Sequence, residues 1–259
     1  MSNIYEALNR RTSADGTEGA DGAPAAEPLA PLVPRPERDR ALPNAGSVAR
    51  DRELEQLRQR ILVEFDPATP TAILFAGSVP GEGSSTLALL LARELAAWEQ
   101  RPVLLIDADL GGFPRSLTGA LGDGDETGPG FSDVLADRAP LADGIRATEQ
   151  SNLHFLPRGS AGAATTELMA PERLQRFVRE AKRHYAFLVF DGSPLVLAAE
   201  TARLAAAVDG AIIVVRAQRT RREVVQKATR LLQQARARSL GVVLNERRYP
   251  IPGFIYRRL

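Results

Sequence analysis

A glycine-rich turn lies between an apolar run and a stretch of helical periodicity in residues 75–92, FAGSVPGEGSSTLALLLA. Gly81 and Gly83 allow the backbone to curl so that successive N–H groups point inward, and the start of the following helix adds its positive end. Between a strand and a helix, such a turn predicts a phosphate-binding loop. The residues expected to bind a nucleotide there are Pro80, Gly81, Glu82, Gly83, Ser84, Ser85 and Thr86.

Two positions of this loop depart from the pattern G-x-x-x-x-G-K-[ST], because Ser78 replaces the first glycine and Ser84 replaces the lysine. Ser85 occupies the position of the hydroxyl that binds Mg²⁺. Loss of the lysine removes a hydrogen bond to a charged group, which is about 1.5–3 kcal/mol of binding, and it also weakens charge neutralisation during phosphoryl transfer. We therefore expect nucleotide binding to survive better than turnover. The expected substitute is an arginine of the C-terminal tail or of a neighbouring subunit.

Two other interpretations of the turn stay open from this segment alone. One is a chance glycine turn between a strand and a helix. The other is a dinucleotide-binding loop of the G-x-G-x-x-G type, which is less favoured because Thr86 stands where the third glycine should be.

Carboxylates end two apolar runs further along the chain. Asp107 and Asp109 follow the run VLLI, and Asp191 follows AFLVF. Beside a phosphate site, paired carboxylates at a strand end suit Mg²⁺ coordination and activation of an attacking hydroxyl, and a third acid can hold the ion through water. We expect Asp107 and Asp109 to be catalytic, and Ser85, Asp107 and Asp191 to bind metal. The alternative is that these acids cap loops.

The elements that must position these residues alternate between helical and short apolar segments. A helix is expected within DRELEQLRQRILVEF, at residues 51–65. The later predicted helices are Leu87–Trp98, Pro171–Arg183, Ala198–Ala207 and Arg221–Arg236. The predicted strands are Thr71–Ala76, Pro102–Ile106, Ala186–Phe190, Ala211–Val215 and Leu240–Leu244. Alternation of this kind predicts an α/β fold, doubly wound around a mostly parallel sheet with helices on both faces.

The first part of the chain differs in composition from the rest. Residues 11–47 are dominated by Ala, Pro, Gly, Asp, Glu and Arg, so they are predicted to form a disordered linker. Residues 1–10 are predicted to form a short amphipathic segment, because Ile4, Ala7 and Leu8 share one helical side. The nucleotide-binding domain is expected to cover 48–259, with a glycine-rich surface loop over 111–130 and a basic C-terminal tail.

Composition excludes several kinds of site. The 259 residues contain no cysteine and two histidines, His154 and His184, which excludes disulfide and thiol chemistry and a histidine-based zinc site. From Val215 to Leu259 there are 12 Arg or Lys residues against Glu223 and Glu246, a formal charge of about +10. This segment fits a solvated basic helix or an acidic partner, whereas the aromatic content of 5% argues against nucleic acid. No segment resembles a signal peptide or a transmembrane helix, which predicts a cytoplasmic location.

Three of these motifs resemble those of a known family. GSVPGEGSST, LLIDADL and LVFDGSP resemble the Walker A, Walker A′ and Walker B motifs of the bacterial tyrosine kinases, the CpsD/CapB-type P-loop ATPases of capsule and exopolysaccharide biosynthesis. The resemblance extends from about Asp51 to the C-terminus and includes GFSDVLAD, NLHFLPRGS, ELMAPERLQRFV, VDGAIIVVRAQRT and GVVLN. It implies a fold like that of MinD and ParA, ATP and Mg²⁺ as cofactors, and a membrane adaptor of the chain-length-regulator type that recruits the protein to the inner face of the cell membrane.

The resemblance also implies roles for particular residues. Asp107 and Asp109 match the pair that binds magnesium and takes part in catalysis. Ser84 occupies the position of the lysine that contacts the β- and γ-phosphates in the family, and Asn245 matches the asparagine that contacts adenine. The family's tyrosine cluster is reduced here to Tyr249 and Tyr256, the candidate phosphoacceptors. Its ring-assembly motif E-x-x-R-x-x-R is matched by Glu55 and Arg58 but not by Ile61, with Arg60 displaced by one position, so a homo-oligomer is an open expectation.

Three functions follow as hypotheses. The first is an ATP-dependent tyrosine autokinase that regulates polysaccharide export. The second is a nucleotide-binding pseudokinase of the same system, because Ser84 replaces the lysine. The third is a partitioning ATPase of the ParA or MinD type, which is less favoured because the early lysine of that loop is absent and the ending PIPGFIYRRL is too short and proline-rich for a membrane helix.

Overall fold

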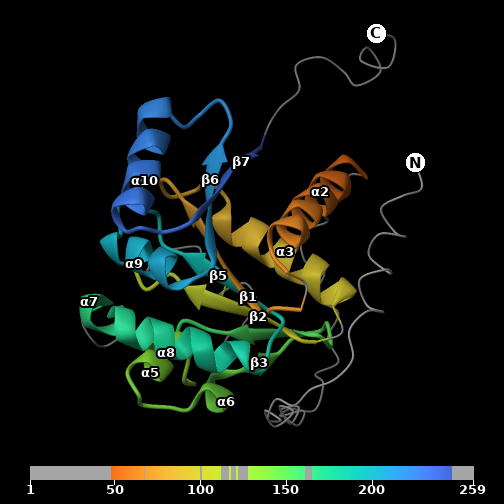
Figure 1. Ribbon diagram of the computed structural model, residues 1–259, viewed down its shortest axis with the longest axis vertical. Coiled ribbons are helices and arrows are strands. Elements are labelled where there is room, and N and C mark those ends of the chain that lie inside the picture. Colours follow the sequence, from red (N-terminus) through yellow and green to blue (C-terminus); the bar gives the residue numbers. More distant parts are fainter. Residues whose placement is uncertain are drawn as a thin grey trace, which may run out of the picture.

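The computed structural model describes residues 48–66, 68–99, 101–111, 117, 121, 128–160 and 165–246 (Figure 1). The helices are α2 (Val48–Glu64), α3 (Ser84–Trp98), α5 (Phe131–Leu135), α6 (Leu141–Gly144), α7 (Thr165–Leu168), α8 (Pro171–Lys182), α9 (Ala199–Ala207) and α10 (Arg222–Gln234). The strands are β1 (Thr71–Gly77), β2 (Val103–Ala108), β3 (Arg146–Ala147), β4 (Leu153–Leu156), β5 (Phe187–Gly192), β6 (Gly210–Arg216) and β7 (Ser239–Asn245).

The strands form one seven-stranded sheet in the order β3-β4-β2-β5-β1-β6-β7. All neighbouring pairs are parallel except the pair of β3 with β4 at one edge. The predicted mostly parallel α/β sheet is therefore confirmed. Because the parallel strands run in the same direction, the carboxyl ends of β1, β2, β4 and β5 share one edge of the sheet, and the functional residues follow these ends.

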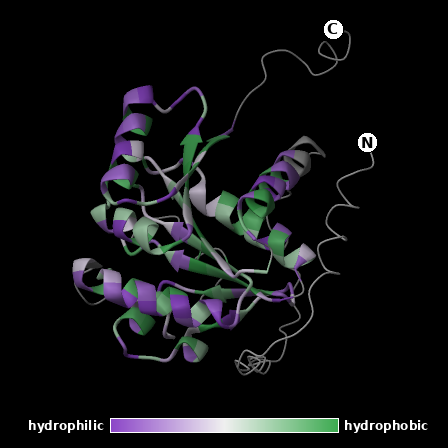
Figure 2. Ribbon diagram, in the orientation of Figure 1, coloured by the Kyte–Doolittle hydropathy of each residue, from purple (hydrophilic) through white to green (hydrophobic). Residues whose placement is uncertain are grey.

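Helices cover both faces of the sheet, α2 and α3 on one side and α8, α9 and α10 on the other (Figure 1). Alternate residues of each strand point to opposite faces, so Ile73 and Phe75 pack with α3, whereas Leu74 packs on the side of α8 and α9. The central strands are apolar up to the acids at their carboxyl ends, whereas helices such as α8 and α10 carry many polar residues (Figure 2). This double burial explains why their sequences show continuous apolar runs rather than alternation.

The expected long elements are present, with boundaries that differ by a few residues. The helix predicted from Leu87 begins at Ser84, because the phosphate loop itself supplies the first turn. The strands β2 and β5 continue through Asp107 and Asp191, so these acids lie within the strands rather than after them. The sequence interpretation omitted β3, β4, α5, α6 and α7, which have two to five residues each and are too short for a recognisable period.

Several predicted segments lie outside the residues that the structure describes. These are the predicted amphipathic segment 1–10, the predicted linker 11–47, most of the predicted loop 111–130 and the predicted C-terminal tail from 247 onward. Across the part that is described, no helix combines the length and apolar character required to cross a bilayer.

Candidate functional site

The phosphate loop connects β1 to α3 at the carboxyl edge of the sheet. Gly81 and Gly83 both have positive φ, 83° and 85°, a conformation that favours glycine. Gly83 is the N-cap of α3, and the first turn of this helix carries neither an acidic residue nor a side chain that caps its N–H groups. Those N–H groups are therefore oriented for an anion, as the glycine pattern predicts.

Glu82 occupies the interior of this loop. Its side chain is 2% exposed and accepts hydrogen bonds from the Ser78 hydroxyl at 2.8 and 2.9 Å, from the Val79 N–H at 3.0 Å and from the Thr220 hydroxyl at 2.6 Å. The Ser78 N–H donates to it as well. Ser78 therefore fits the first-glycine position because its hydroxyl bonds with Glu82. That Glu82 binds a nucleotide stays a prediction for its backbone, while its carboxylate bonds with Ser78, Val79 and Thr220.

Asn245, at the end of β7, lies over the same loop. Its Nδ2 donates to the Glu82 carbonyl oxygen at 2.9 Å. A Cβ on Gly83 would lie 2.2 Å from this Nδ2 atom, so the close approach requires glycine. Strand β7 and the phosphate loop are thus joined directly, which places the candidate adenine contact beside the candidate phosphate site.

The three strand-end acids come together on adjacent strands. Asp107 of β2 pairs in register with Asp191 of β5, and Asp191 pairs with Phe75 of β1, just before the phosphate loop. Asp107, Asp109 and Asp191 are 0%, 6% and 1% exposed. Three neighbouring buried carboxylates repel one another unless cations neutralise them, so their burial together costs stability. Clusters of this kind are typical of functional sites.

Burial alters the acidity of two of these groups. It raises the pKa of Asp191 well above its ordinary value, and the neighbouring charges of Asp107 and Asp109 raise it further, while Ser85 and Arg158 act in the opposite direction. Burial also raises the pKa of Asp109, which is partly offset by the hydrogen bond from Ser193 and by the charge of Arg158. A carboxylate with a raised pKa is a better proton acceptor, so Asp109 is suited to take a proton from a hydroxyl.

Arg158 is a site residue that the sequence interpretation missed. It follows β4, and its guanidinium lies 3.9 Å from Asp107 (Nε to Oδ1) and 3.9 Å from Asp109 (Nη2 to Oδ2). The signal for it was available, because PRG directly follows the apolar run LHFL of NLHFLPRGS. That run is too short to identify as a strand by itself, which left the position of Arg158 unknown.

The loop that carries Arg158 is fixed by α5. The Arg158 carbonyl accepts from the Ser132 N–H at 2.9 Å, and the Pro157 carbonyl accepts from the Phe131 N–H at 2.8 Å. On its other side, Ser160 donates to Asp133 from both its N–H (3.0 Å) and its hydroxyl (2.7 Å). The backbone of Arg158 is therefore held on both sides.

The residues fit a hydrated Mg²⁺ ion rather than a site enclosed by protein ligands. Both carboxylate oxygens of Asp191 are buried, and neither accepts a hydrogen bond of regular geometry among the described residues. The same residues contain no group of three His, Cys, Asp or Glu side chains arranged to hold a metal by themselves. Mg²⁺ keeps several waters and binds through one or two carboxylates and substrate phosphates, so Ser85, Asp107 and Asp191 form a suitable partial set.

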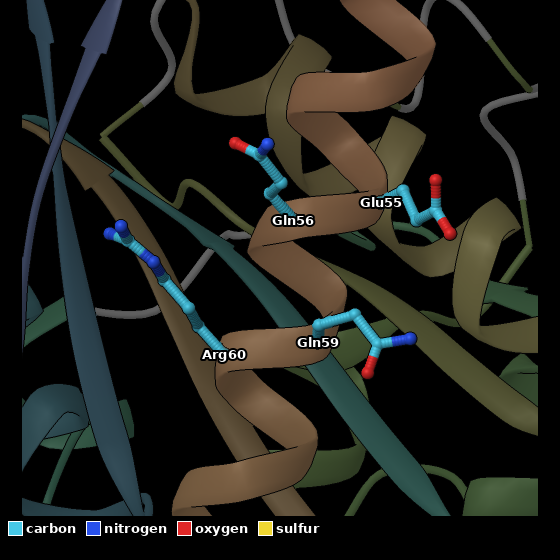
Figure 3. A pocket seen from close by; sticks show the side chains of 4 residues that line it. All are labelled: Glu55, Gln56, Gln59 and Arg60. Atoms are coloured by element: carbon cyan, nitrogen blue, oxygen red, sulfur yellow. The ribbon is translucent and has the colours of Figure 1, made fainter. Parts of the chain in front are cut away.

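Other predicted residues are not part of this cluster. Ser84 begins α3 with a half-exposed side chain, whereas Thr86 is exposed. The candidate phosphoacceptors Tyr249 and Tyr256 lie outside the described residues. A separate surface pocket lies along α2 and contains none of the phosphate-site residues (Figure 3). Its lining residues are Glu55, Gln56, Gln59 and Arg60.

Arg58, the second residue of the candidate ring motif, is buried at 3% exposure. Its Nε bonds with Glu94 of α3 at 3.2 Å, and its guanidinium lies 4.2 Å from the ring centre of Trp98. Within this chain, Arg58 therefore packs α2 against α3, whereas Glu55 and Arg60 are exposed.

Comparison with known proteins places this site in a family context. The chain is 32% identical over 167 residues to the tyrosine-protein kinase CpsD of Streptococcus agalactiae, covering 64% of this chain and 71% of that protein. It is 28% identical over 174 residues to the tyrosine-protein kinase YwqD of Bacillus subtilis, covering 67% and 71%. No protein-family profile matches the chain.

Solved structures agree with these relatives. The kinase domain of VpsO has a TM-score of 0.64 at 28% identity, covering 76% of this chain and 98% of that one. The cell division ATPase MinD of Pyrococcus furiosus has a TM-score of 0.54 at 24% identity, covering 67% and 71%, and this likeness shows the shared P-loop fold alone. By sequence and by fold, the chain belongs to the bacterial tyrosine-protein kinase family.

Proposed function

We propose that this protein is an ATP-binding, tyrosine autokinase-like component of a capsule or exopolysaccharide system, which works with a membrane adaptor. The observation that carries the proposal is the meeting of Asp107, Asp109 and Asp191 with the phosphate loop at one edge of the sheet. The named relatives are tyrosine-protein kinases, which supports the same activity class.

The side chains have distinct roles in this proposal. The N–H groups at the start of α3 bind phosphate oxygens, and Asn245 contacts the base from β7. Ser85, Asp107 and Asp191 would hold Mg²⁺, which when bound neutralises phosphate charge. Asp109, held by the hydroxyl of Ser193, accepts the proton of an incoming tyrosine hydroxyl.

A second candidate function, a nucleotide-binding pseudokinase, is favoured by one observation. Ser84 stands at the lysine position, and residues 78–86 contain Glu82 but no lysine or arginine. Removal of a charge-bearing donor costs more in the transition state than in binding. This candidate binds ATP and signals its presence to the adaptor without transferring phosphate. A partitioning ATPase has no support beyond the shared fold.

The test compares the parent protein with Ser84→Lys and Asp109→Asn. Calorimetry with Mg²⁺ and ATP measures binding, and mass spectrometry measures phosphotyrosine with a membrane adaptor of the chain-length-regulator type supplied. Phosphotyrosine in the parent that Asp109→Asn abolishes supports the autokinase. Binding without phosphotyrosine in the parent, with phosphotyrosine in Ser84→Lys, supports the pseudokinase. Absence of ATP binding in the parent contradicts both.

A further inference from the structure

The phosphate site has an excess of negative charge. Asp107, Asp109 and Asp191 are buried on adjacent strands, and Glu82 is buried within the loop. The corresponding cation of the loop is absent because residue 84 is serine. A polyphosphate that enters this site meets carboxylates, so its binding requires positive charge from elsewhere in the protein or from metal.

Arg158 supplies positive charge at the opposite side of the site from the phosphate loop. The sheet order β4-β2-β5-β1 places Arg158 after β4 and the loop after β1, with the acidic ends of β2 and β5 between them. Its ion pairs with Asp107 and Asp109 show that the guanidinium extends over β2 toward the loop. Asp191 lies close enough to both sides to be affected by Arg158 and by Ser85 of the loop.

The position and shape of this guanidinium suit a phosphate ligand. It lies 3.9 Å from the carboxylates of both Asp107 and Asp109, beside the expected path of a polyphosphate. Arginine also presents several N–H donors in one plane, a geometry that matches phosphate oxygens. Its side chain is 19% exposed, so it is accessible while largely shielded from solvent.

The backbone that carries Arg158 is preorganised. Gly159 has a φ of 82°, and a Cβ there would lie 2.3 Å from the Asp133 carboxylate, so the turn packs closely on α5. Asp133 accepts hydrogen bonds from Gly130 and Ser160 and closes the same turn. A donor fixed in this way stabilises charge without a large cost of reorganisation.

We propose that Arg158 binds the terminal phosphates of ATP from the β4 side of the site. Its charge takes the place of the loop cation that is missing because residue 84 is serine. This inference rests on the proposed binding of ATP. In the ligand-free protein Arg158 lies beside Asp107 and Asp109. With Mg²⁺ and nucleotide bound, its side chain would turn from these carboxylates toward the phosphate.

The experiment is a double-mutant cycle between positions 158 and 84. The dissociation constants of ATP and AMP are measured with Mg²⁺ for the parent, Arg158→Ala, Ser84→Lys and the double variant. We expect Arg158→Ala to weaken ATP binding about tenfold or more, as loss of a hydrogen bond to a charged group does, and to leave AMP binding within about twofold. In the Ser84→Lys background the loss should fall to roughly threefold or less, because the loop then supplies its own cation.

Two further variants keep the test decisive. Arg158→Lys retains the charge and should recover part of the ATP affinity, whereas Arg158→Met, an uncharged side chain of similar length to lysine, should recover none. This pair applies even where Arg158→Ala folds poorly. Arg203→Ala is the matched control, because Arg203 is an exposed arginine that donates to the Thr166 carbonyl at 3.1 Å. Melting curves of each variant without nucleotide show that the fold is retained.

The outcomes separate this inference from the proposed function. ATP binding by the parent that Arg158→Ala leaves unchanged, or an equal loss in both Ser84 backgrounds, overturns the role of Arg158 and leaves the proposed function standing. Tighter ATP binding by Arg158→Ala shows instead that Arg158 competes with the ligand for the carboxylates, which also overturns it. Absence of ATP binding by the parent and by Ser84→Lys overturns both.

Discussion

The Ser78 hydroxyl donates to both oxygens of the Glu82 carboxylate, at 2.9 and 2.8 Å, within the phosphate loop. Ser78 is fully buried, so loss of this hydroxyl leaves a buried charge with fewer partners. We predict that Ser78→Ala lowers the free energy of unfolding by about 1–3 kcal/mol, measured by urea denaturation. Ser151→Ala, in an exposed turn, is the control and should change it by less than about 0.5 kcal/mol. Equal effects of the two substitutions would show that the bond contributes nothing.

Two buried aspartates should respond to the same substitution with opposite sign. Asp191 carries a raised pKa through burial, so at neutral pH its charge destabilises the ligand-free fold. Burial also acts to raise the pKa of Asp133, but hydrogen bonds from Ser160 and Gly130 outweigh it and the net pKa is lowered. We predict that Asp191→Asn raises the melting temperature without nucleotide, by roughly 2–4 °C per kcal/mol, and that Asp133→Asn lowers it.

The pH dependence of these variants provides the check. The contribution of Asp133 is present above its unfolded-state pKa of about 3.9 and is lost as pH falls through the lower folded-state value. For Asp191 the folded state retains its proton to higher pH, so its cost grows as pH rises. Calorimetric melting between acidic and neutral pH measures both slopes. A lower melting temperature of Asp191→Asn at neutral pH would contradict the charge-burial account.

His154 should titrate below its ordinary range. Burial lowers its pKa, and its Nδ1 lies 2.9 Å from the hydroxyl of Tyr185, which is itself buried. A lowered folded-state pKa gives stability that is present above about 6.5 and is lost as pH falls through the folded-state value. NMR titration of the ring protons measures this pKa, with His184→Gln used to assign the two histidine signals. A midpoint at or above that of an unfolded peptide would refute the prediction.

The turn behind Arg158 leaves little room for a side chain at Gly159, which has a φ of 82°. We predict that Gly159→Ala destabilises the fold by about 1–3 kcal/mol and weakens ATP binding, because it displaces the loop that carries Arg158. Gly241→Ala is a matched control, since its φ of 128° is also positive but a Cβ there meets nothing within 4 Å. The control should lose stability while ATP affinity stays unchanged. Equal ATP affinity in both variants would separate Gly159 from the site.

Arg58 should act in packing rather than in contacts between subunits. Its burial between Glu94 and Trp98 predicts that Arg58→Ala lowers the free energy of unfolding by about 1–2 kcal/mol and alters the fluorescence of Trp98, the chain's one tryptophan. Arg60→Ala, on the exposed side of the same helix, should leave both unchanged. Light scattering of the two variants then reports separately on assembly. An unchanged unfolding curve for Arg58→Ala would exclude a packing role.

The long elements of this fold were predictable because each has enough residues to show a period or a continuous apolar run. The strand β5 is an example, since a strand buried on both faces shows a continuous apolar run, here residues 187–190 before Asp191. β4 could not be identified in the same way, because four residues fit a strand or a buried turn equally well. Arg158 was missed for that reason.

The sequence indicated which residues form the site better than it indicated how those residues contact one another. The motif spacing indicated that Asp107 and Asp191 are close, and their pairing in register agrees with it. The loop pattern assigned Glu82 to the nucleotide, whereas its carboxylate also accepts a hydrogen bond from Thr220, which follows β6 and is 138 positions away. Spacing along the chain carries no information about this contact, because it arises from the packing of segments that are distant in sequence.

The buried acids at the ends of β2 and β5 also affect the lifetime of the protein against proteolysis. Any cation or nucleotide complex that binds them in the folded chain alone adds a free energy of RT ln(1 + [L]/Kd), about 2.7 kcal/mol at a hundredfold excess over Kd. A protease that cleaves the transiently opened chain acts on a population that shrinks by the same factor. Resistance to proteolysis, and with it the half-life of the protein, is therefore set partly by the ligand that occupies this acidic edge.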